Sequence, residues 1–115
     1  MYRFAYAEIL EEGGSAARER EREVFDHCIA LLEAAEKAGN GSKAAIEAIF
    51  FTRRLWAFLI EDLGSTDNQL PDALRGNLIS IGLWVLREIE SIRLGNSQNF
   101  RGVIDVIRSV REGLK

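Results

Sequence analysis

A single proline, Pro71, interrupts the 115 residues of this chain, and this scarcity leaves long stretches free to be helical. Proline removes a backbone donor and breaks helix interiors, so its absence permits a helix wherever the other residues favour one. Glycines divide the chain instead, at Gly13-Gly14, Gly39-Asn40-Gly41, 64–68 and Gly95-Asn96. A glycine directly after a helical segment is typical of a left-handed C-cap. The segments between these breaks are therefore predicted to be helices.

Helical periodicity and capping residues set the limits of these helices. Ser42 stands where an N-cap hydroxyl would accept from the first free amides, and Pro71 fits the first turn of a helix. A short N-terminal arm precedes the first helix. The four predicted helices are 15–38, 43–63, 71–94 and 98–113. A chain of this length forms one domain, so we expect an all-α, compact single-domain helical bundle with short connections.

Composition excludes several classes of protein. With 47% hydrophobic and 29% charged residues, the chain has enough apolar surface to fold. A net charge of −3 gives no general attraction for nucleic acid or anionic lipid. Its uncharged stretches are too short to span a bilayer, so we expect no membrane insertion. One cysteine, Cys28, excludes an intramolecular disulfide and suits a reducing compartment.

The residues that catalysis requires are not arranged for it. The only histidine, His27, precedes Cys28 on a predicted helix, where adjacent side chains point about 100° apart and cannot form a thiolate–imidazole pair. No spacing of cysteine and histidine fits a zinc site, and no phosphate-binding loop follows a strand. We therefore expect no enzyme activity, no catalytic or metal-binding residue and no cofactor. Cys28 is expected to pack in the core.

The two ends of the chain differ in charge. Acidic residues outnumber basic ones in 1–41, and the reverse holds in 96–115. This distribution can orient the packing of the two terminal segments. The last predicted helix is amphipathic, with an apolar stripe inward and Arg101, Arg108 and Arg111 outward.

The second predicted helix is apolar nearly all round. Its polar strip is narrow and consists of Lys43, Glu47, Arg54 and Glu61. One broad side carries Ile46, Ile49, Phe50, Trp56, Leu59, Ile60 and Leu63. A second apolar row, Phe51, Leu55 and Phe58, lies on the other side of the polar strip. Such a helix is either central in its domain or has one face covered by a partner, and both possibilities stay open.

The third predicted helix has the same surplus of apolar residues. Beside its main stripe, a second row contains Ile79, Leu83 and Leu86, and Trp84 lies off both. Gly76 and Gly82 weaken this helix by about 1 kcal/mol each relative to alanine. A helix tolerates such glycines where another helix or a bound chain approaches closely.

Several of these segments are distinctive in combination. Arg53-x-Leu55-Trp56 lies within the run 50–63, and Leu78-Ile79-Ser80-Ile81-Gly82-x-Trp84 follows. Tyr6-Ala7-Glu8, 18–21, 68–75 and Asn99-Phe100 complete the pattern. Together they resemble the FlaF family of flagellar biosynthesis regulators of alphaproteobacteria, essentially from end to end. Gly76 departs from the alanine expected there, which concerns only local helix stability.

The resemblance implies a cytoplasmic protein needed for flagellin production and export, working with the regulator FlbT. It implies either a flagellin secretion chaperone or a regulator of flagellin synthesis that acts through FlbT or flagellin messenger RNA. For a chaperone, the predicted partner-binding residues are the two second rows and both tryptophans: Phe51, Leu55, Trp56, Phe58, Ile79, Leu83, Trp84 and Leu86. Arg53 and Arg54 are possible polar contacts. Direct nucleic-acid binding is not expected, because the basic residues are interleaved with acids.

Overall fold

The residues that the structure describes form four helices, which account for most of the chain. The computed structural model describes residues 15–113, and the predicted N-terminal arm lies outside them. Within this range the chain forms only helices and connecting loops, which confirms the all-α prediction. The helices are α2 (Ser15–Ala38), α3 (Lys43–Leu63), α4 (Asp72–Arg93) and α5 (Phe100–Glu112).

The predicted helix ends are correct to within two residues. The Ser42 hydroxyl accepts from the Ala45 amide at 3.1 Å, which confirms the N-cap of α3. Pro71 is the N-cap residue of α4 and lies just before its first turn. Asn99 caps α5, because its side-chain oxygen accepts from the Gly102 amide at 3.0 Å. A left-handed cap was predicted at Gly39, Gly64 and Gly95. Gly39 and Gly95 have positive φ angles of 91° and 82°, as predicted. Gly64 has a φ of −83°, so the prediction was wrong there.

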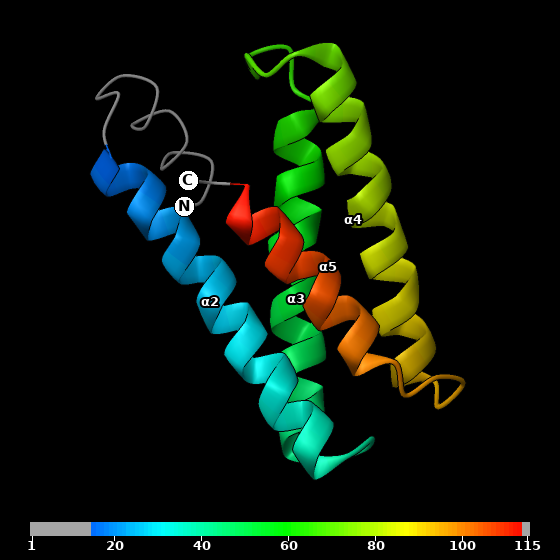
Figure 1. Cartoon of the computed structure of the whole chain (residues 1–115). Helices are drawn as coiled ribbons and strands as arrows, with labels where there is room; N and C mark the ends of the chain where they lie inside the picture. Colours follow the sequence, from blue (N-terminus) through cyan, green and yellow to red (C-terminus); the bar gives the residue numbers. More distant parts are fainter. Residues whose placement is uncertain (1–14, 114–115) are drawn as a thin grey trace.

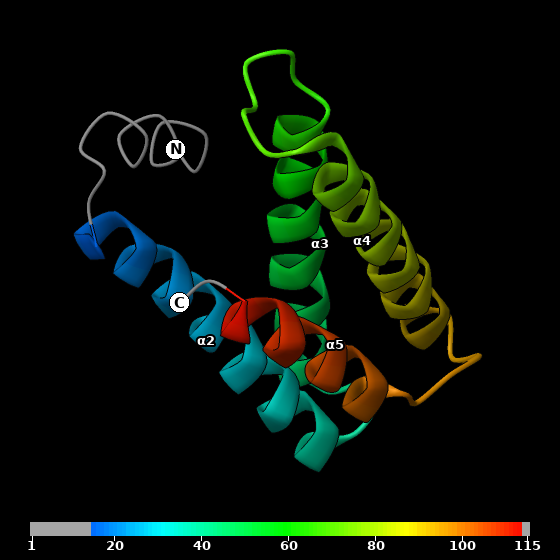
Figure 2. The same ribbon diagram turned by 45° about the horizontal axis from the view of Figure 1, so that its top comes forward.

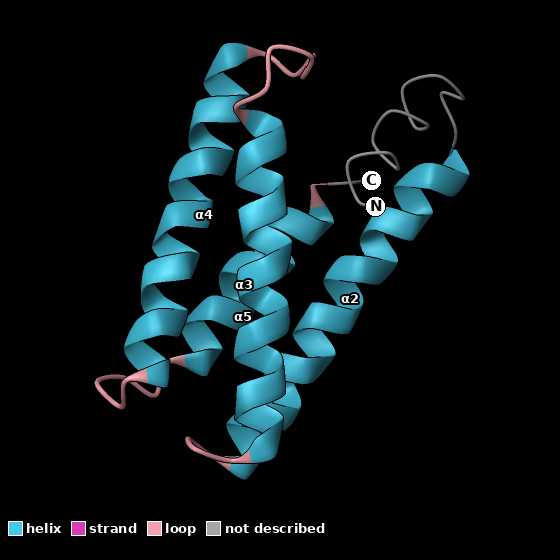
Figure 3. Ribbon diagram, turned by 180° about the vertical axis from the view of Figure 1, so that it is seen from behind, coloured by secondary structure: helices cyan, strands magenta, loops and turns pink. Residues whose placement is uncertain are grey.

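The central helix of the bundle is α3. It packs against α2 on one side and α4 on the other, and α5 crosses in front, packing against α2 and more lightly against α4 (Figure 1). Figure 2 shows the same arrangement tilted, with α5 over the end of the bundle where α2 meets α3. Seen from behind, no other described helix crosses α3 and α4 (Figure 3). That rear face is therefore the part of the bundle where α3 is covered least.

All four helices contribute to one core. Its largest fully buried side chains include Phe25, Leu32, Trp56, Val85, Ile89, Ile104 and Ile107. Trp56 of α3 lies edge-on to Phe25 of α2, with ring centroids 6.2 Å apart. A Cβ at Gly82 of α4 would lie 2.8 Å from Cε3 of Trp56 and 2.9 Å from Ile60. The predicted close approach at Gly82 is therefore confirmed, and it joins α3 to α4.

Gly76 has a different environment from Gly82. A Cβ there would meet no atom within 4 Å, so no other described helix approaches it. The prediction that another helix approaches closely was wrong at this position, and the approach of a bound chain stays a prediction. Within the described residues, Gly76 weakens the exposed first half of α4 without a packing reason.

Cys28 lies in the core, as predicted. Its sulfur is 3.2 Å from the hydroxyl of Thr52, the buried polar residue of α3. Burial raises the pKa of the Cys28 thiol to about 11, although the contact with Thr52 acts in the opposite direction. The thiol is therefore protonated at neutral pH and serves as a small packing group.

Ion pairs join the oppositely charged ends of the chain. Arg101 donates to Glu36 at 2.6 Å, Arg108 to Glu33 at 3.1 Å, and Arg111 to Asp26 at 2.9 Å. The three arginines belong to α5 and the three carboxylates to α2. The predicted electrostatic pairing of the terminal segments is confirmed, because all three ion pairs join α5 to α2.

Candidate functional site

The second apolar row of α3 faces α2. Leu55 is only 6% exposed and belongs to the core, while Phe51 and Phe58 are half-buried. Phe51 packs edge-on against His27 of α2, with ring centroids 4.9 Å apart. Of the two possibilities left open by the sequence, coverage within the domain therefore holds for Leu55 and, in part, for Phe51.

The second row of α4 is more accessible. Leu83 is 48% exposed, and Ile79 and Leu86 are half-buried. Trp84 is half-buried against the core, whereas Trp56 is 1% exposed and fully part of it. Binding of a partner by the accessible residues stays a prediction. Trp56 has no exposed side-chain surface for that purpose.

The second row of α3 and the second row of α4 lie on different sides of α3. The contact of Gly82 shows that α4 meets α3 at Trp56 and Ile60. On a helix, Phe51 lies about 140° from Trp56, because each residue turns about 100°. The α3 row therefore faces α2, and the α4 row lies beyond the opposite side of α3.

The largest exposed apolar side chains of α3 are Ile46 and Phe50, at 63% and 57% exposure. In the sequence both belong to the broad apolar side and to neither predicted partner-binding row, so their exposure at the surface was missed. One signal was present: Phe50 and Arg54, four residues apart, are only about 40° apart around the helix. Phe50 thus borders the polar strip.

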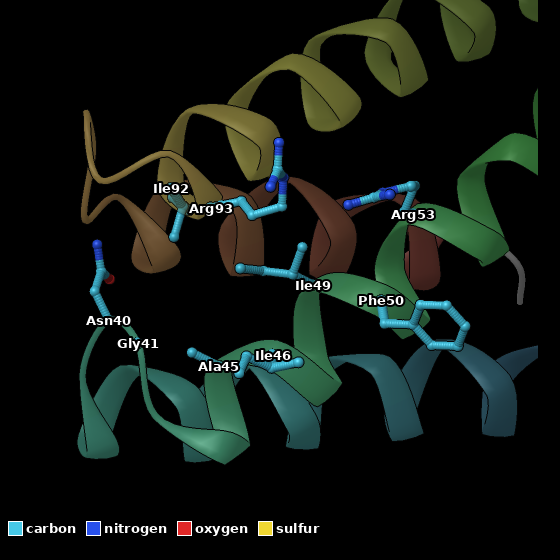
Figure 4. Close-up of a pocket in the computed structure, with 9 residues that line it drawn as sticks. All are labelled: Asn40, Gly41, Ala45, Ile46, Ile49, Phe50, Arg53, Ile92 and Arg93. Carbon is cyan, nitrogen blue, oxygen red and sulfur yellow. The ribbon is translucent and has the colours of Figure 1, made fainter.

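Ile46 and Phe50 border a pocket of about 320 Å³ between the start of α3 and the end of α4. We call it the α3–α4 pocket. It is lined by Asn40, Gly41, Ala45, Ile46, Ile49, Phe50, Arg53, Ile92 and Arg93. In Figure 4, the two arginines lie on one side of Ile49, and Ile46 and Phe50 lie on the other. The pocket therefore has an apolar floor and a cationic edge.

Glu90 connects the two arginines of the pocket edge. Arg93 donates two hydrogen bonds to it, at 2.9 and 2.6 Å, whereas the nearest nitrogen of Arg53 is 3.9 Å away. The hydrogen bonds from Arg93 lower the pKa of Glu90 and raise the pKa of Arg93. Glu90 is thus ionised at neutral pH and fixes Arg93. Arg53 is held less firmly, and its side chain is half-exposed.

The neighbouring arginine has a different role. The guanidinium of Arg54 stands over the ring of Phe50, 5.6 Å from its centroid. Such a contact stabilises an exposed pair by about 0.5–1 kcal/mol. Arg54 therefore holds Phe50 at the edge of the pocket. The two arginines predicted as polar contacts are thus both close to this pocket.

Metal binding has no candidate group in residues 15–113. No cluster of three or more histidine, cysteine, aspartate or glutamate side chains is placed to hold an ion there. The α3–α4 pocket and its surroundings present apolar side chains and guanidinium groups, which are typical of surfaces that bind other protein chains.

The sequence was compared with models of protein families, with curated proteins and with solved structures. A model described as flagellar protein FlaF matches residues 2–114. No match was found among curated proteins or among solved structures. The family match includes every helix described above, together with the pocket between α3 and α4. Since it spans nearly the whole sequence, the chain belongs to the FlaF family of flagellar proteins.

Proposed function

We propose that this FlaF-family protein is a non-enzymatic, cytoplasmic secretion chaperone that binds flagellin and supports its production and export, working with FlbT. The observation that carries the proposal is the set of exposed apolar side chains on α3 and α4, above all Ile46, Phe50 and Leu83. Membership in a flagellar family supplies the biological setting. Within residues 15–113, no helix has the length and hydropathy needed to cross a bilayer.

The physical basis is the shielding of apolar surface. Subunits that polymerise through amphipathic helices must keep those helices covered until they are exported. A partner can cover them by accepting the apolar face of a helix in an apolar groove. Large exposed apolar side chains near one another are typical of such surfaces. On α3 and α4 these side chains lie on two helices that are closely packed where Gly82 meets Trp56.

Co-purification tests the proposal. The full chain is expressed with flagellin alone, with FlbT alone and with both, and the recovered complexes are compared. A chaperone retains flagellin in the absence of FlbT. Recovery of FlbT without flagellin in every combination would contradict the proposal and favour a regulator that acts through FlbT. Binding of flagellin messenger RNA that weakens steeply with salt would favour direct regulation, because counterions are released from phosphates.

Substitutions identify which surface binds flagellin. Phe50→Glu and Leu83→Glu place a charge at exposed positions, so we expect the fold to be retained. We expect flagellin recovery to fall, because the charge interrupts the apolar surface. Ala34→Glu adds the same charge at an exposed position on α2 and serves as the matched control. Circular dichroism confirms that each variant is folded. Unchanged flagellin recovery with both α3 and α4 variants would remove this face from the proposed function.

A further inference from the structure

The α3–α4 pocket combines two features that together select a ligand. Its floor is built by Ile46, Ile49 and Ile92, from two helices whose ends meet there. The connections at this end are tied together, because the Asn40 side chain donates to the Ser97 carbonyl at 2.9 Å. Asn40 also lines the pocket, so this hydrogen bond joins one wall of the pocket to the loop before α5.

The charge around the pocket is opposite to that of the whole chain. The charged residues that line it are Arg53 and Arg93, and no carboxylate does. Within one turn of the lining positions on α3 and α4, the four basic residues Lys43, Arg53, Arg54 and Arg93 outnumber the three acidic residues Glu47, Glu88 and Glu90. The whole chain has a net charge of −3. This end of the rear face is thus a local cationic patch around an apolar pocket, complementary to an acidic apolar segment.

The two arginines are not equally available. Arg93 is fixed by its two hydrogen bonds to Glu90, so its charge is partly neutralised. Arg53 approaches the same carboxylate only to 3.9 Å and keeps half of its side chain exposed. A guanidinium in this state can exchange a loose internal contact for a bidentate pair with an incoming carboxylate. Arg53 is therefore the residue expected to pair with a carboxylate of the ligand.

We propose that the α3–α4 pocket is the docking site for an acidic amphipathic helix of a partner protein. A bulky apolar side chain of that helix enters between Ile46, Ile49 and Ile92, and a carboxylate on an adjacent turn pairs with Arg53. Phe50, held by Arg54, packs against the apolar face of the helix. The proposal deepens the proposed function and rests on it for the kind of partner, since the helix belongs to the flagellar protein that is bound.

A synthetic peptide tests the chemistry of the pocket without flagellin. The probe is a helix of about five turns with leucine along one face and glutamate along the other. A matched peptide carries lysine in place of glutamate. Calorimetric titration into the full chain measures both affinities, and amide chemical shifts locate the contact. The glutamate peptide is expected to bind more tightly and to shift the amides of Gly41, Ile46 and Arg93.

Charge reversal sharpens the test. Arg53→Glu is expected to weaken binding of the glutamate peptide by about fivefold to tenfold and to strengthen binding of the lysine peptide. Arg87→Glu makes the same charge change at an exposed position of α4, about 120° around the helix from Arg93, and leaves both affinities unchanged. Ile46→Gln, at an exposed site that the fold does not need, weakens both peptides.

The proposal would be overturned by equal affinity for the two peptides, by no effect of Arg53→Glu, or by shifted amides that map away from the pocket. Dimerisation of the chain that Arg53→Glu abolishes would identify a second copy as the occupant and would also overturn it. If flagellin does not co-purify but the chain still binds the glutamate peptide more tightly than the lysine peptide, the proposed function is contradicted and the pocket proposal stands. The two proposals are therefore separable.

Discussion

The two sides of α3 have similar compositions and opposite roles. One side carries Phe51 and Leu55 and is covered by α2, whereas the rear side carries Ile46 and Phe50 and is exposed. Both are rows of bulky apolar residues on the same helix. Which row becomes core is decided by where α2 and α4 attach, and hydrophobicity alone does not distinguish them. The row left uncovered is the one next to the cationic pocket edge.

The largest effect is expected when the same charge is placed on each side. Leu55→Asp puts a carboxylate into the core and should lower the free energy of unfolding by at least about 3 kcal/mol. Phe50→Asp places it in solvent and should cost about 1 kcal/mol or less, from helix propensity and the lost contact with Arg54. Urea denaturation followed by circular dichroism measures both. Equal losses would mean that the two sides of α3 are not distinguished as described.

An intermediate effect is expected from the two glycines of α4. Gly82→Ala introduces a methyl group against the rigid ring of Trp56, and we expect a net destabilisation of about 1–2 kcal/mol. Gly76→Ala meets open space and should stabilise the protein by up to about 1 kcal/mol. Thermal unfolding of the two variants compares them directly. A gain in stability from Gly82→Ala would show that α3 and α4 are less tightly packed than this contact requires.

The smallest effect concerns the ion pairs between α2 and α5. Arg101→Gln and Arg108→Gln remove partly exposed pairs, so each loss of stability should be small at low salt and smaller still at high salt. Arg87→Gln, which removes an exposed arginine of α4, is the control and should show no such salt dependence. Chemical denaturation at two ionic strengths gives the comparison. A loss that does not change with salt would assign these arginines a packing role.

Much of the fold could be predicted from the sequence because its signals are local. Pro71, Ser42 and the glycine breaks mark helix ends through backbone geometry that does not depend on the rest of the chain. The attraction between α2 and α5 was also predictable, because the charge difference between the two ends of the sequence requires no knowledge of packing. Gly64 was the exception among the predicted caps, since its helix ends in a right-handed turn.

The candidate site was harder to predict because it depends on how the helices are rotated. Leu55 and Phe50 lie on opposite sides of the polar strip of one helix, so the nearness of Phe50 to Arg54 does not by itself say which side α2 will cover. Gly76 and Gly82 show the same limit: both are glycines inside α4, and only the approach of Trp56 separates them. The pocket itself joins residues of α3 to Ile92 and Arg93, roughly forty to fifty positions away, so it arises only from tertiary packing.

The position of Trp56 has a consequence for how the protein can be observed. Its indole contacts Phe25 of α2 and Gly82 of α4 from its place on α3, so three helices share one chromophore. Separation of either neighbouring helix admits water to the same ring and shifts its emission to longer wavelength. Ligands at the α3–α4 pocket do not reach that ring. In a Trp84→Phe variant, which leaves Trp56 as the one tryptophan of the sequence, intrinsic fluorescence therefore provides an optical signal for the integrity of the bundle that does not depend on occupancy of the α3–α4 pocket.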